Sequence, residues 1–181
     1  HQAMVEEFIE GCEISVEFIS YNGIHYPLQI TDKVTTEAPH FVELEHHQPS
    51  TLSEEMFATI YDITKNALNA LGLTNGASHA EYKITKDDRI AIMEIGGRMG
   101  GDFIGSDLVR LSTGYDFVKG VIDVALGEFS EPVKTLNMYS GVYFLCKETE
   151  CLKRTIENWQ ANPLFVVGEI TDTKLREVTC S

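Results

Sequence analysis

Apolar and polar residues alternate along two neighbouring segments near the start of the chain. Glu13–Ser20 alternates with the period of a half-buried strand. Its apolar residues on one face are Ile14, Val16 and Phe18. Asn22-Gly23 follows, a dipeptide typical of two-residue hairpin turns, and Ile24–Thr31 has the composition of a returning strand. The pattern therefore predicts an antiparallel hairpin.

Apolar residues at helical spacing occupy the next part of the chain. The residues that mark one helix face are Leu52, Met56, Ile60, Ile63, Ala67, Leu68 and Leu71. We expect Ser50 or Thr51 to cap this helix, with Glu54 completing a capping box from Thr51, and the glycine after Leu71 to end it. The polar residues 35–50 predict a long loop with a short strand near Phe41–Leu44.

The remaining pattern predicts a second hairpin, a glycine-rich loop, two helices and a short tail. The hairpin strands are expected over Gly76–Thr85 and Arg89–Ile95, and the loop over Gly96–Gly105. The helices are expected over Ser106–Leu111 and Tyr115–Leu126. The tail is expected to run strand, helix, strand over Tyr139–Cys146, Glu148–Asn158 and Leu164–Thr171.

Charge and composition exclude several classes of partner. The chain has 181 residues, with 14 Lys+Arg against 28 Asp+Glu and a net charge of −14, so its surface repels nucleic-acid phosphates and anionic lipid. The longest apolar run, Val142–Cys146, is far shorter than the roughly 20 residues that span a bilayer. The four cysteines form no C-x-x-C pair. We therefore expect a soluble, cytoplasmic protein with reduced thiols, and neither nucleic acid nor membrane as a partner.

Two carboxylates fall where the strands of the second hairpin lie side by side. Glu81 lies mid-strand and Glu94 ends the other strand. We expect Tyr82 to pair with Met93 across this hairpin, with residues 83–88 between the two paired positions. The neighbouring residues Glu81 and Glu94 would then face each other. Like charges so placed are destabilising unless a divalent cation neutralises them. The alternative is that one carboxylate points to solvent.

The glycine-rich loop after this hairpin carries Arg98. Glycine lets the backbone approach a ligand closely, and a fixed guanidinium binds a carboxylate or phosphoryl group through two parallel hydrogen bonds. His79, two residues before Glu81, can share its strand face, and we expect a core or supporting residue there instead of a ligand. His46 and His47 are adjacent, so on a strand they cannot both face one site.

Together with Val5–Val16, these segments resemble the ATP-grasp superfamily of ligases. The family's adenine hinge, V-E-x-(F/Y)-(I/L) followed by G-x-E-(I/F)-(S/T)-V, matches Val5–Val16. Its metal signature, a Glu on one strand and E-x-N-x-R on the next, matches Glu81 and Glu94–Arg98. Within the superfamily the chain looks like the carboxylate–amine ligases that join amino acids into dipeptides.

The resemblance implies an α+β fold. It is the C-terminal subdomain of the ATP-grasp module, a mainly antiparallel sheet flanked by helices, with a small β-α-β tail. Residues 1–131 would be the C-terminal portion of the ATP-grasp domain, and residues 132–181 the start of a truncated C-terminal β-α-β subdomain. The abrupt start before Val5 is expected to be a cut inside the module, so we expect this fragment alone not to turn over ATP.

The resemblance also implies a nucleotide site. The implied adenine-binding residues are Glu6, Glu7, Phe8 and Ile9. The backbone of Glu7 and Ile9 would bind the adenine edge, with Glu6 beside it. Glu13 would accept the ribose hydroxyls, and Lys33 would contact phosphate.

The implied chemistry lies at the second hairpin and its loop. Glu81 and Glu94 would hold Mg²⁺ or Mn²⁺ on the phosphates of ATP. Arg98 would stabilise the acyl-phosphate and the oxyanion formed when an amine attacks it. The implied activity is ATP-dependent C–N bond formation between a small-molecule carboxylate and an amine, with ADP and phosphate released.

One departure from the family pattern supports an alternative. Gly96 stands where the family has a metal-binding Asn, so a catalytically inactive nucleotide- or metabolite-binding module is the second hypothesis. A structural domain whose acids are merely solvated is the third. The sequence carries no signal for the oligomeric state.

Overall fold

The first two strands form the hairpin that the alternating pattern predicts. The structure, a computed structural model, describes residues 3–36 and 38–164. β1 (Cys12–Tyr21) and β2 (Ile24–Thr35) pair antiparallel. Asn22 and Gly23 take φ values of 50° and 79°, the left-handed conformation that a two-residue hairpin turn requires. The expected hairpin is confirmed, although β2 continues past Thr31.

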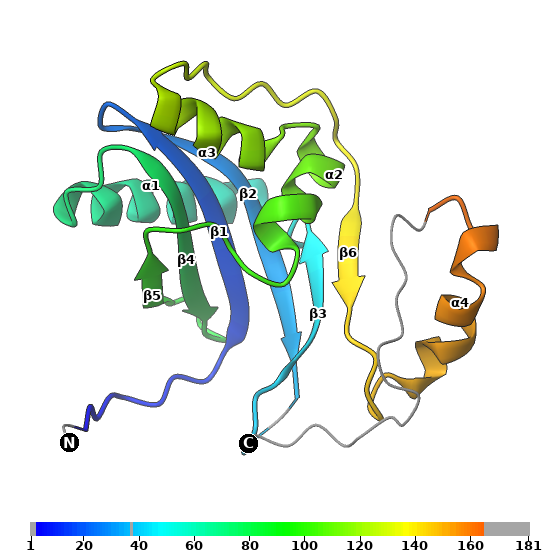
Figure 1. The fold of residues 1–181 in the computed structure, drawn as a ribbon. Helices are drawn as coiled ribbons and strands as arrows, with labels where there is room; N and C mark the ends of the chain where they lie inside the picture. The colour runs from blue at the N-terminus through cyan, green and yellow to red at the C-terminus, as the bar shows by residue number, and fades with distance from the viewer. Residues whose placement is uncertain (1–2, 37, 165–181) are drawn as a thin grey trace. The chain divides into compact units, whose positions relative to one another are not determined.

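Within the described residues, six strands form one sheet in the order β5-β4-β1-β2-β3-β6 (Figure 1). The other strands are β3 (Glu43–Gln48), β4 (Gly76–Ile84), β5 (Ile90–Gly96) and β6 (Ser140–Tyr143). β4 pairs antiparallel with both β1 and β5. The expected antiparallel sheet is therefore confirmed, and β3 covers later residues than the strand expected near Phe41–Leu44.

α1 (Glu54–Ala70) covers one face of the sheet. Its buried residues Ile60 and Leu68 belong to a hydrophobic cluster with alternate residues of β1, β2 and β4. The strand residues of this cluster are Ile14, Val16, Phe18, Ile30, Ala80, Tyr82 and Ile84. The face of β1 that alternation predicts to be apolar is therefore the face that packs on α1.

α1 begins later in the sequence than expected, at Glu54. Ser53 caps the helix by accepting the backbone N–H of Met56 at 3.2 Å. The hydroxyl groups of Ser50 and Thr51 instead donate to the carboxylate of Asp32. Because these side chains are held at β2, the expected capping box from Thr51 is wrong.

Short helices cover part of the opposite face of the sheet (Figure 1). The π-helical turn η1 (Ile104–Leu108) continues into α2 (Val109–Thr113), and α3 (Phe117–Leu126) follows. The second hydrophobic cluster contains Ile19, Leu28, Ala77, Val109 and Phe117. The helix expected over 106–111 thus begins as a π-helical turn. α3 starts two residues later than expected because Asp116 is its N-cap.

The chain divides into two compact units. Of the described residues, the first unit contains 3–33 and 47–142, and the second contains 34–36, 38–46 and 143–164. Helical segments of the second unit are η2 (Glu150–Leu152), α4 (Lys153–Glu157) and η3 (Trp159–Ala161). The continuous helix expected over 148–158 is therefore wrong, and the strand expected over 139–146 is reduced to β6. The strand expected over 164–171 lies outside the described residues from position 165 on.

A search of the described helices for a membrane span gives a negative result. None of them combines the length and the apolar character that crossing a bilayer requires.

Candidate functional site

Charged and polar residues occupy the face of the sheet opposite α1. Along β1, Glu13, Ser15 and Glu17 alternate with the apolar residues that pack on the helix. The strand register places Glu13 opposite Lys33 of β2 and Lys83 of β4. Glu13 Oε1 lies 3.3 Å from Lys33 Nζ, and Glu13 Oε2 lies 3.4 Å from Lys83 Nζ. Glu13 is thus held between two cations.

Lys33 joins Glu13 to Glu81. The Lys33 side chain is 3% exposed, and its Nζ lies 2.7 Å from Glu81 Oε1. A buried ammonium needs anionic partners of this kind, because burial without them costs several kcal/mol. The residue expected to contact phosphate therefore also fixes two carboxylates of the expected nucleotide site.

Glu81 is ionised and uses one of its two oxygens for protein contacts. Oε1 accepts hydrogen bonds from Lys33 Nζ at 2.7 Å and from His79 Nε2 at 3.1 Å. The hydrogen bond from His79, and then the contact with Lys33, lower the pKa of Glu81 to about 2, although partial burial opposes them. Within the described part of the chain no donor reaches Oε2, so this oxygen remains available to a cation.

His79 connects Glu81 to a second carboxylate, that of Glu17. His79 Nδ1 contacts the Glu17 carboxylate, which is completely buried. Burial by itself lowers the pKa of His79, but the hydrogen bonds and charges of Glu17 and Glu81 raise it to about 9. Glu17 Oε2 also accepts the backbone N–H of Gly100 at 3.0 Å. His79 is thus a supporting residue, as expected.

Sequence reasoning missed two members of this cluster, Lys83 and the buried Glu17. The available signal for Glu17 was its position, because it is an even number of residues from Glu13 on the same strand and therefore shares its face. The register of β1 with β4 places Glu17 directly opposite His79, and that pairing is visible only once these two strands, which are distant in sequence, are aligned.

β5 brings Glu94 opposite Glu81. The two residues are directly paired in the register of β4 and β5, so their side chains point to the same face. A bulge between Glu81 and Tyr82 pairs Tyr82 with Ile92, where the spacing predicted Met93. The expected pairing of Tyr82 with Met93 is therefore wrong, while the expected pairing of Glu81 with Glu94 is confirmed.

The donor set of Glu81 and Glu94 fits a hard divalent cation. Mg²⁺ is usually bound in proteins by one or two carboxylates together with phosphates and waters. Glu81 is ionised with one oxygen unengaged, and Glu94 is exposed. Residues 3–36 and 38–164 provide no ion pair to Glu94, so the repulsion between the two carboxylates is left for a cation to relieve.

Arg98 lies in the loop just beyond the end of β5 and is exposed. Its Nη1 donates to the carbonyl oxygen of Met99 at 2.9 Å. No carboxylate of the described residues forms an ion pair with it. The guanidinium therefore stays at the surface on the chain segment that directly follows Glu94.

The expected adenine segment Val5–Ile9 leads into β1 without regular secondary structure (Figure 1). Glu7 Oε2 forms an ion pair with Arg89 Nη2 at 3.4 Å. At Gly11 a Cβ would lie 2.3 Å from the carbonyl oxygen of Ile84, so glycine allows the chain to pass this close to β4. The segment leads into the strand that carries Glu13.

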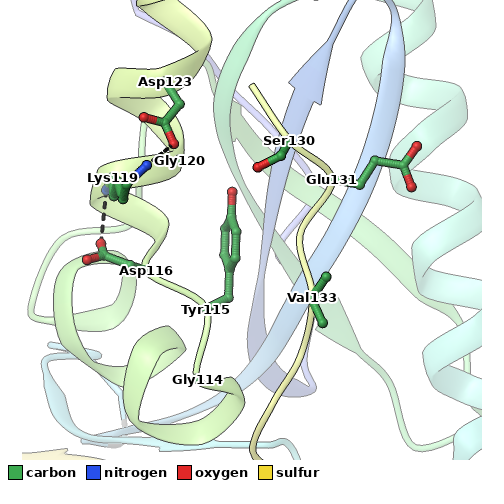
Figure 2. A pocket seen from close by; sticks show the side chains of 9 residues that line it. All are labelled: Gly114, Tyr115, Asp116, Lys119, Gly120, Asp123, Ser130, Glu131 and Val133. Atoms are coloured by element: carbon green, nitrogen blue, oxygen red, sulfur yellow. Dashed lines mark hydrogen bonds and ion pairs between the residues drawn. The ribbon is translucent and has the colours of Figure 1, made fainter. Parts of the chain in front are cut away.

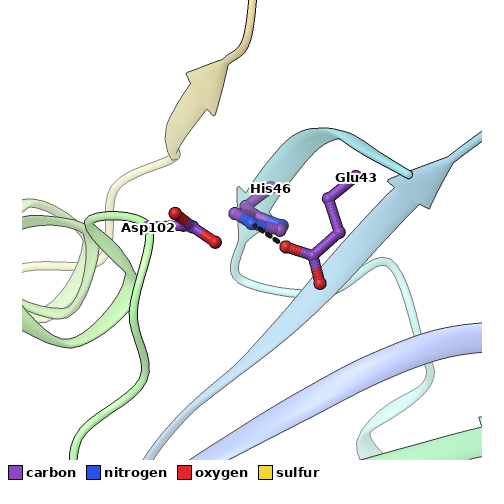
Figure 3. A group of neighbouring side chains, drawn as sticks. All are labelled: Glu43, His46 and Asp102. Carbon is purple, nitrogen blue, oxygen red and sulfur yellow. Dashed lines mark ion pairs between the residues drawn. The ribbon is translucent and has the colours of Figure 1, made fainter. Parts of the chain in front are cut away.

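Two other groups lie outside this network. A pocket of about 260 Å³ opens beside α3, and Figure 2 shows Tyr115 between α3 and the chain near Val133. Burial, and then the charges of Asp123 and Asp116, raise the pKa of Tyr115 to about 12. In the second unit, His46 Nε2 lies 3.2 Å from Glu43 Oε2 (Figure 3). Neither group contains a residue that the family motifs assign.

The site residues fall within a stretch that matches a known family. Residues 1–107 match the model of the ATP-grasp domain. The chain belongs to the ATP-grasp family. The matched stretch runs past Arg98 and contains every residue for which the ATP-grasp motifs imply a role.

Three similar proteins show which ATP-grasp enzymes this chain is related to. Alanine–anticapsin ligase of Bacillus subtilis (strain 168) is 38% identical over 88 residues, which are 49% of this chain and 18% of that protein. Carnosine synthase 1 of Homo sapiens is 27% identical over 124 residues, which are 68% of this chain and 15% of that protein. The crystal structure of an L-amino acid ligase from Bacillus licheniformis matches with a TM-score of 0.69 at 31% identity, covering 76% of this chain and 34% of that one. The chain therefore spans less than a fifth of the length of these two curated relatives.

Proposed function

We propose that this chain belongs to an ATP-dependent carboxylate–amine ligase that binds ATP with Mg²⁺ or Mn²⁺. The observation that carries the proposal is Glu81 opposite Glu94, with Glu81 ionised and one of its oxygens unengaged. Residues 1–131 are then the C-terminal portion of the ATP-grasp domain, and residues 132–181 the start of the β-α-β subdomain. Membership of the family supports this division without testing its boundary.

The nucleotide would bind along β1 and the segment before it. In this proposal the backbone of Glu7 and Ile9 binds the adenine edge, with Glu6 and Phe8 beside it. Glu13 accepts the ribose hydroxyls, and its carboxylate is already fixed by the lysines on either side. A charged carboxylate is a strong acceptor for hydroxyl donors. Lys33 contacts phosphate from the same face of the sheet.

The reacting groups would lie at the end of β5. Glu81 and Glu94 hold the divalent cation, which neutralises phosphate charge when it is bound. An oxygen of the substrate carboxylate bonds to the γ-phosphorus of ATP while the bond to ADP breaks. The amine then attacks the acyl-phosphate, loses a proton to water and forms the amide as phosphate leaves. Arg98 stabilises the negative charge that develops in both steps.

The substrates that fit this proposal are small carboxylates and amines. The names of the related L-amino acid ligase, alanine–anticapsin ligase and carnosine synthase support amino acids as both acid and amine. The net charge of −14 repels nucleic-acid phosphates. It is compatible with ATP as a substrate, because the bound divalent cation offsets part of the negative charge of ATP.

One observation favours a second function, a binding module without turnover. Gly96 offers no side-chain oxygen at the position where the family places Asn. Phosphate release from ATP in the presence of amino-acid pairs separates the two functions. A ligase releases phosphate and forms an amide, whereas the inactive module binds nucleotide and releases none.

Metal binding by the full-length protein tests the metal centre itself. Mn²⁺ is titrated by electron paramagnetic resonance in the presence of a non-hydrolysable ATP analogue. The variants are Glu81→Gln, Glu94→Gln and, as a control with the same change of charge, Glu55→Gln on α1. We expect both site variants to weaken Mn²⁺ binding by at least roughly tenfold and the control to leave it unchanged.

The same variants differ in stability. Glu81→Gln removes one anionic partner from each of Lys33 and His79 and should lower the free energy of unfolding. Glu94→Gln should not lower it, because this substitution removes the repulsion between two facing carboxylates. If both site variants bind Mn²⁺ like the parent protein, the two carboxylates are structural and the proposed ligase has no metal centre.

A further inference from the structure

Glu17 is a fully buried carboxylate to which the proposed reaction gives no role. Its exposed fraction is 0%. Its Oε2 accepts the N–H of Gly100 at 3.0 Å, and its carboxylate contacts His79 Nδ1. A buried carboxylate is costly unless donors satisfy it. The structure therefore requires both the loop amide and the histidine to be in place beside Glu17.

His79 extends this contact to the expected metal ligand. Its Nε2 lies 3.1 Å from Glu81 Oε1, while its Nδ1 faces Glu17. Because both ring nitrogens are engaged by carboxylates, the imidazole cannot turn without losing a contact. His79 and Lys33 together hold Glu81 by Oε1, and no donor of the described residues reaches Oε2.

Gly100 is closely fitted to this pair. A Cβ at Gly100 would lie 2.6 Å from Glu17 Oε1 and 2.8 Å from His79 Nδ1, distances that side-chain carbons do not adopt. At the neighbouring Gly101 a Cβ would meet no heavy atom within 4 Å. The two glycines therefore form a matched pair in which only the first packs against the network.

We propose that Glu17 and His79 are positioning residues that couple the loop carrying Arg98 to the metal-binding carboxylate of Glu81. The inference rests on the proposed function. Gly100 follows Arg98 by two residues, and its N–H is held by Glu17 while His79 holds Glu81. Two groups that act on the same phosphate are thus located by one hydrogen-bonded chain across β1 and β4.

Substitution of the matched glycines in the full-length protein tests this coupling. Mn²⁺ affinity is measured with a non-hydrolysable ATP analogue, and kcat and KM are measured with MgATP. Gly100→Ala should raise the Kd for Mn²⁺ by roughly 10–100-fold, the usual cost of removing a group that orients a metal ligand. It should lower kcat more than it changes the KM for ATP, whereas Gly101→Ala should change neither.

Two further variants separate positioning from a general loss of stability. His79→Gln replaces two ring nitrogens that contact different carboxylates with a single amide nitrogen, and it should raise the Kd for Mn²⁺ as Gly100→Ala does. Ile60→Val removes a methyl group from the core beneath α1 and should lower the melting temperature without changing the Kd. Metal-free thermal unfolding identifies which variants are folded under the assay conditions.

The outcomes distinguish this inference from the function on which it rests. If folded Gly100→Ala and His79→Gln bind Mn²⁺ like the parent while Glu81→Gln does not, the coupling is wrong and the metal site stands. If Glu81→Gln also binds Mn²⁺ like the parent, the proposed function fails. If Gly100→Ala does not fold, the Mn²⁺ affinity of His79→Gln decides between the same outcomes. If either of these variants does not fold, Glu17→Gln, which preserves the side-chain volume, is measured in its place.

Discussion

Gly96 is the residue at which this chain departs from the ATP-grasp metal motif. Its φ lies outside the left-handed region, and the nearest atom to an added Cβ would be Arg98 Cγ at 3.5 Å, which is ordinary van der Waals contact. Neither backbone strain nor lack of space therefore explains the glycine. An oxygen-bearing side chain could stand there beside Glu94.

We expect Gly96→Asn to restore a ligand to the proposed metal site. Because a Cβ at position 96 meets only ordinary contacts, the melting temperature should stay close to that of the parent while Mn²⁺ binds more tightly. Gly97→Asn is the matched control, since its Cβ would also meet only an ordinary contact, Leu73 Cδ1 at 3.5 Å. Weaker Mn²⁺ binding in Gly96→Asn than in Gly97→Asn would contradict this prediction.

Local spacing was sufficient to predict some residues of the site but not others. Glu81 and Glu94 belong to one hairpin, so counting residues across its turn is enough to bring them together. Glu17 meets His79 through a different pair of strands, and Gly100 through a loop that returns to the sheet. Contacts of this kind depend on tertiary structure, and no short window of sequence contains them.

Among the elements of secondary structure too, those set by the local sequence were predictable and those set by tertiary contacts were not. The β1–β2 hairpin was predictable because strand alternation and Asn22-Gly23 both favour it. The start of α1 was not, because two hydroxyl side chains that could cap it are bound by Asp32 on β2. The π-helical turn η1 was not predictable from the local pattern either, and it packs closely on the preceding loop, where a Cβ at Gly105 would lie 2.9 Å from Met99 Cβ.

α3 offers a test of packing at the level of a single element. A Cβ at Gly120 would lie 2.1 Å from the hydroxyl oxygen of Tyr115. Alanine is normally favoured over glycine inside a helix by about 1 kcal/mol, but overpacking typically costs about 1–3 kcal/mol. We therefore expect Gly120→Ala to lower the free energy of unfolding measured in urea.

A double-mutant cycle identifies the cause of that loss. In the Tyr115→Phe background the hydroxyl is gone, so Gly120→Ala should cost less than it does in the parent protein. Equal losses in the two backgrounds would show that the hydroxyl is not what excludes a side chain at Gly120.

Electrostatic repulsion acts on the molecule as a whole. The net charge of −14 destabilises the compact state through self-repulsion, while ion pairs at exposed residues contribute little. Raising sodium chloride from about 10 mM to about 150 mM shortens the Debye length from about 30 Å to about 8 Å. We expect the melting temperature of the metal-free protein to rise by a few degrees.

Differential scanning fluorimetry at several salt concentrations measures this effect. Tetramethylammonium chloride should act like sodium chloride, because screening depends on ionic strength and not on a bound cation. A melting temperature that falls as salt increases would mean that attractive pairs outweigh the net repulsion.

The two donors that share Oε1 of Glu81 also bear on which cation the proposed site selects. Because Lys33 and His79 already engage one oxygen of this carboxylate, Glu81 would offer a bound cation its other oxygen. Ca²⁺ takes six to eight oxygens and commonly draws two of them from one carboxylate, whereas Mg²⁺ keeps a small octahedral shell that is filled by single oxygens and waters. In the proposed site the hydrogen bonds that fix Glu81 would therefore make this residue a better ligand for magnesium than for calcium.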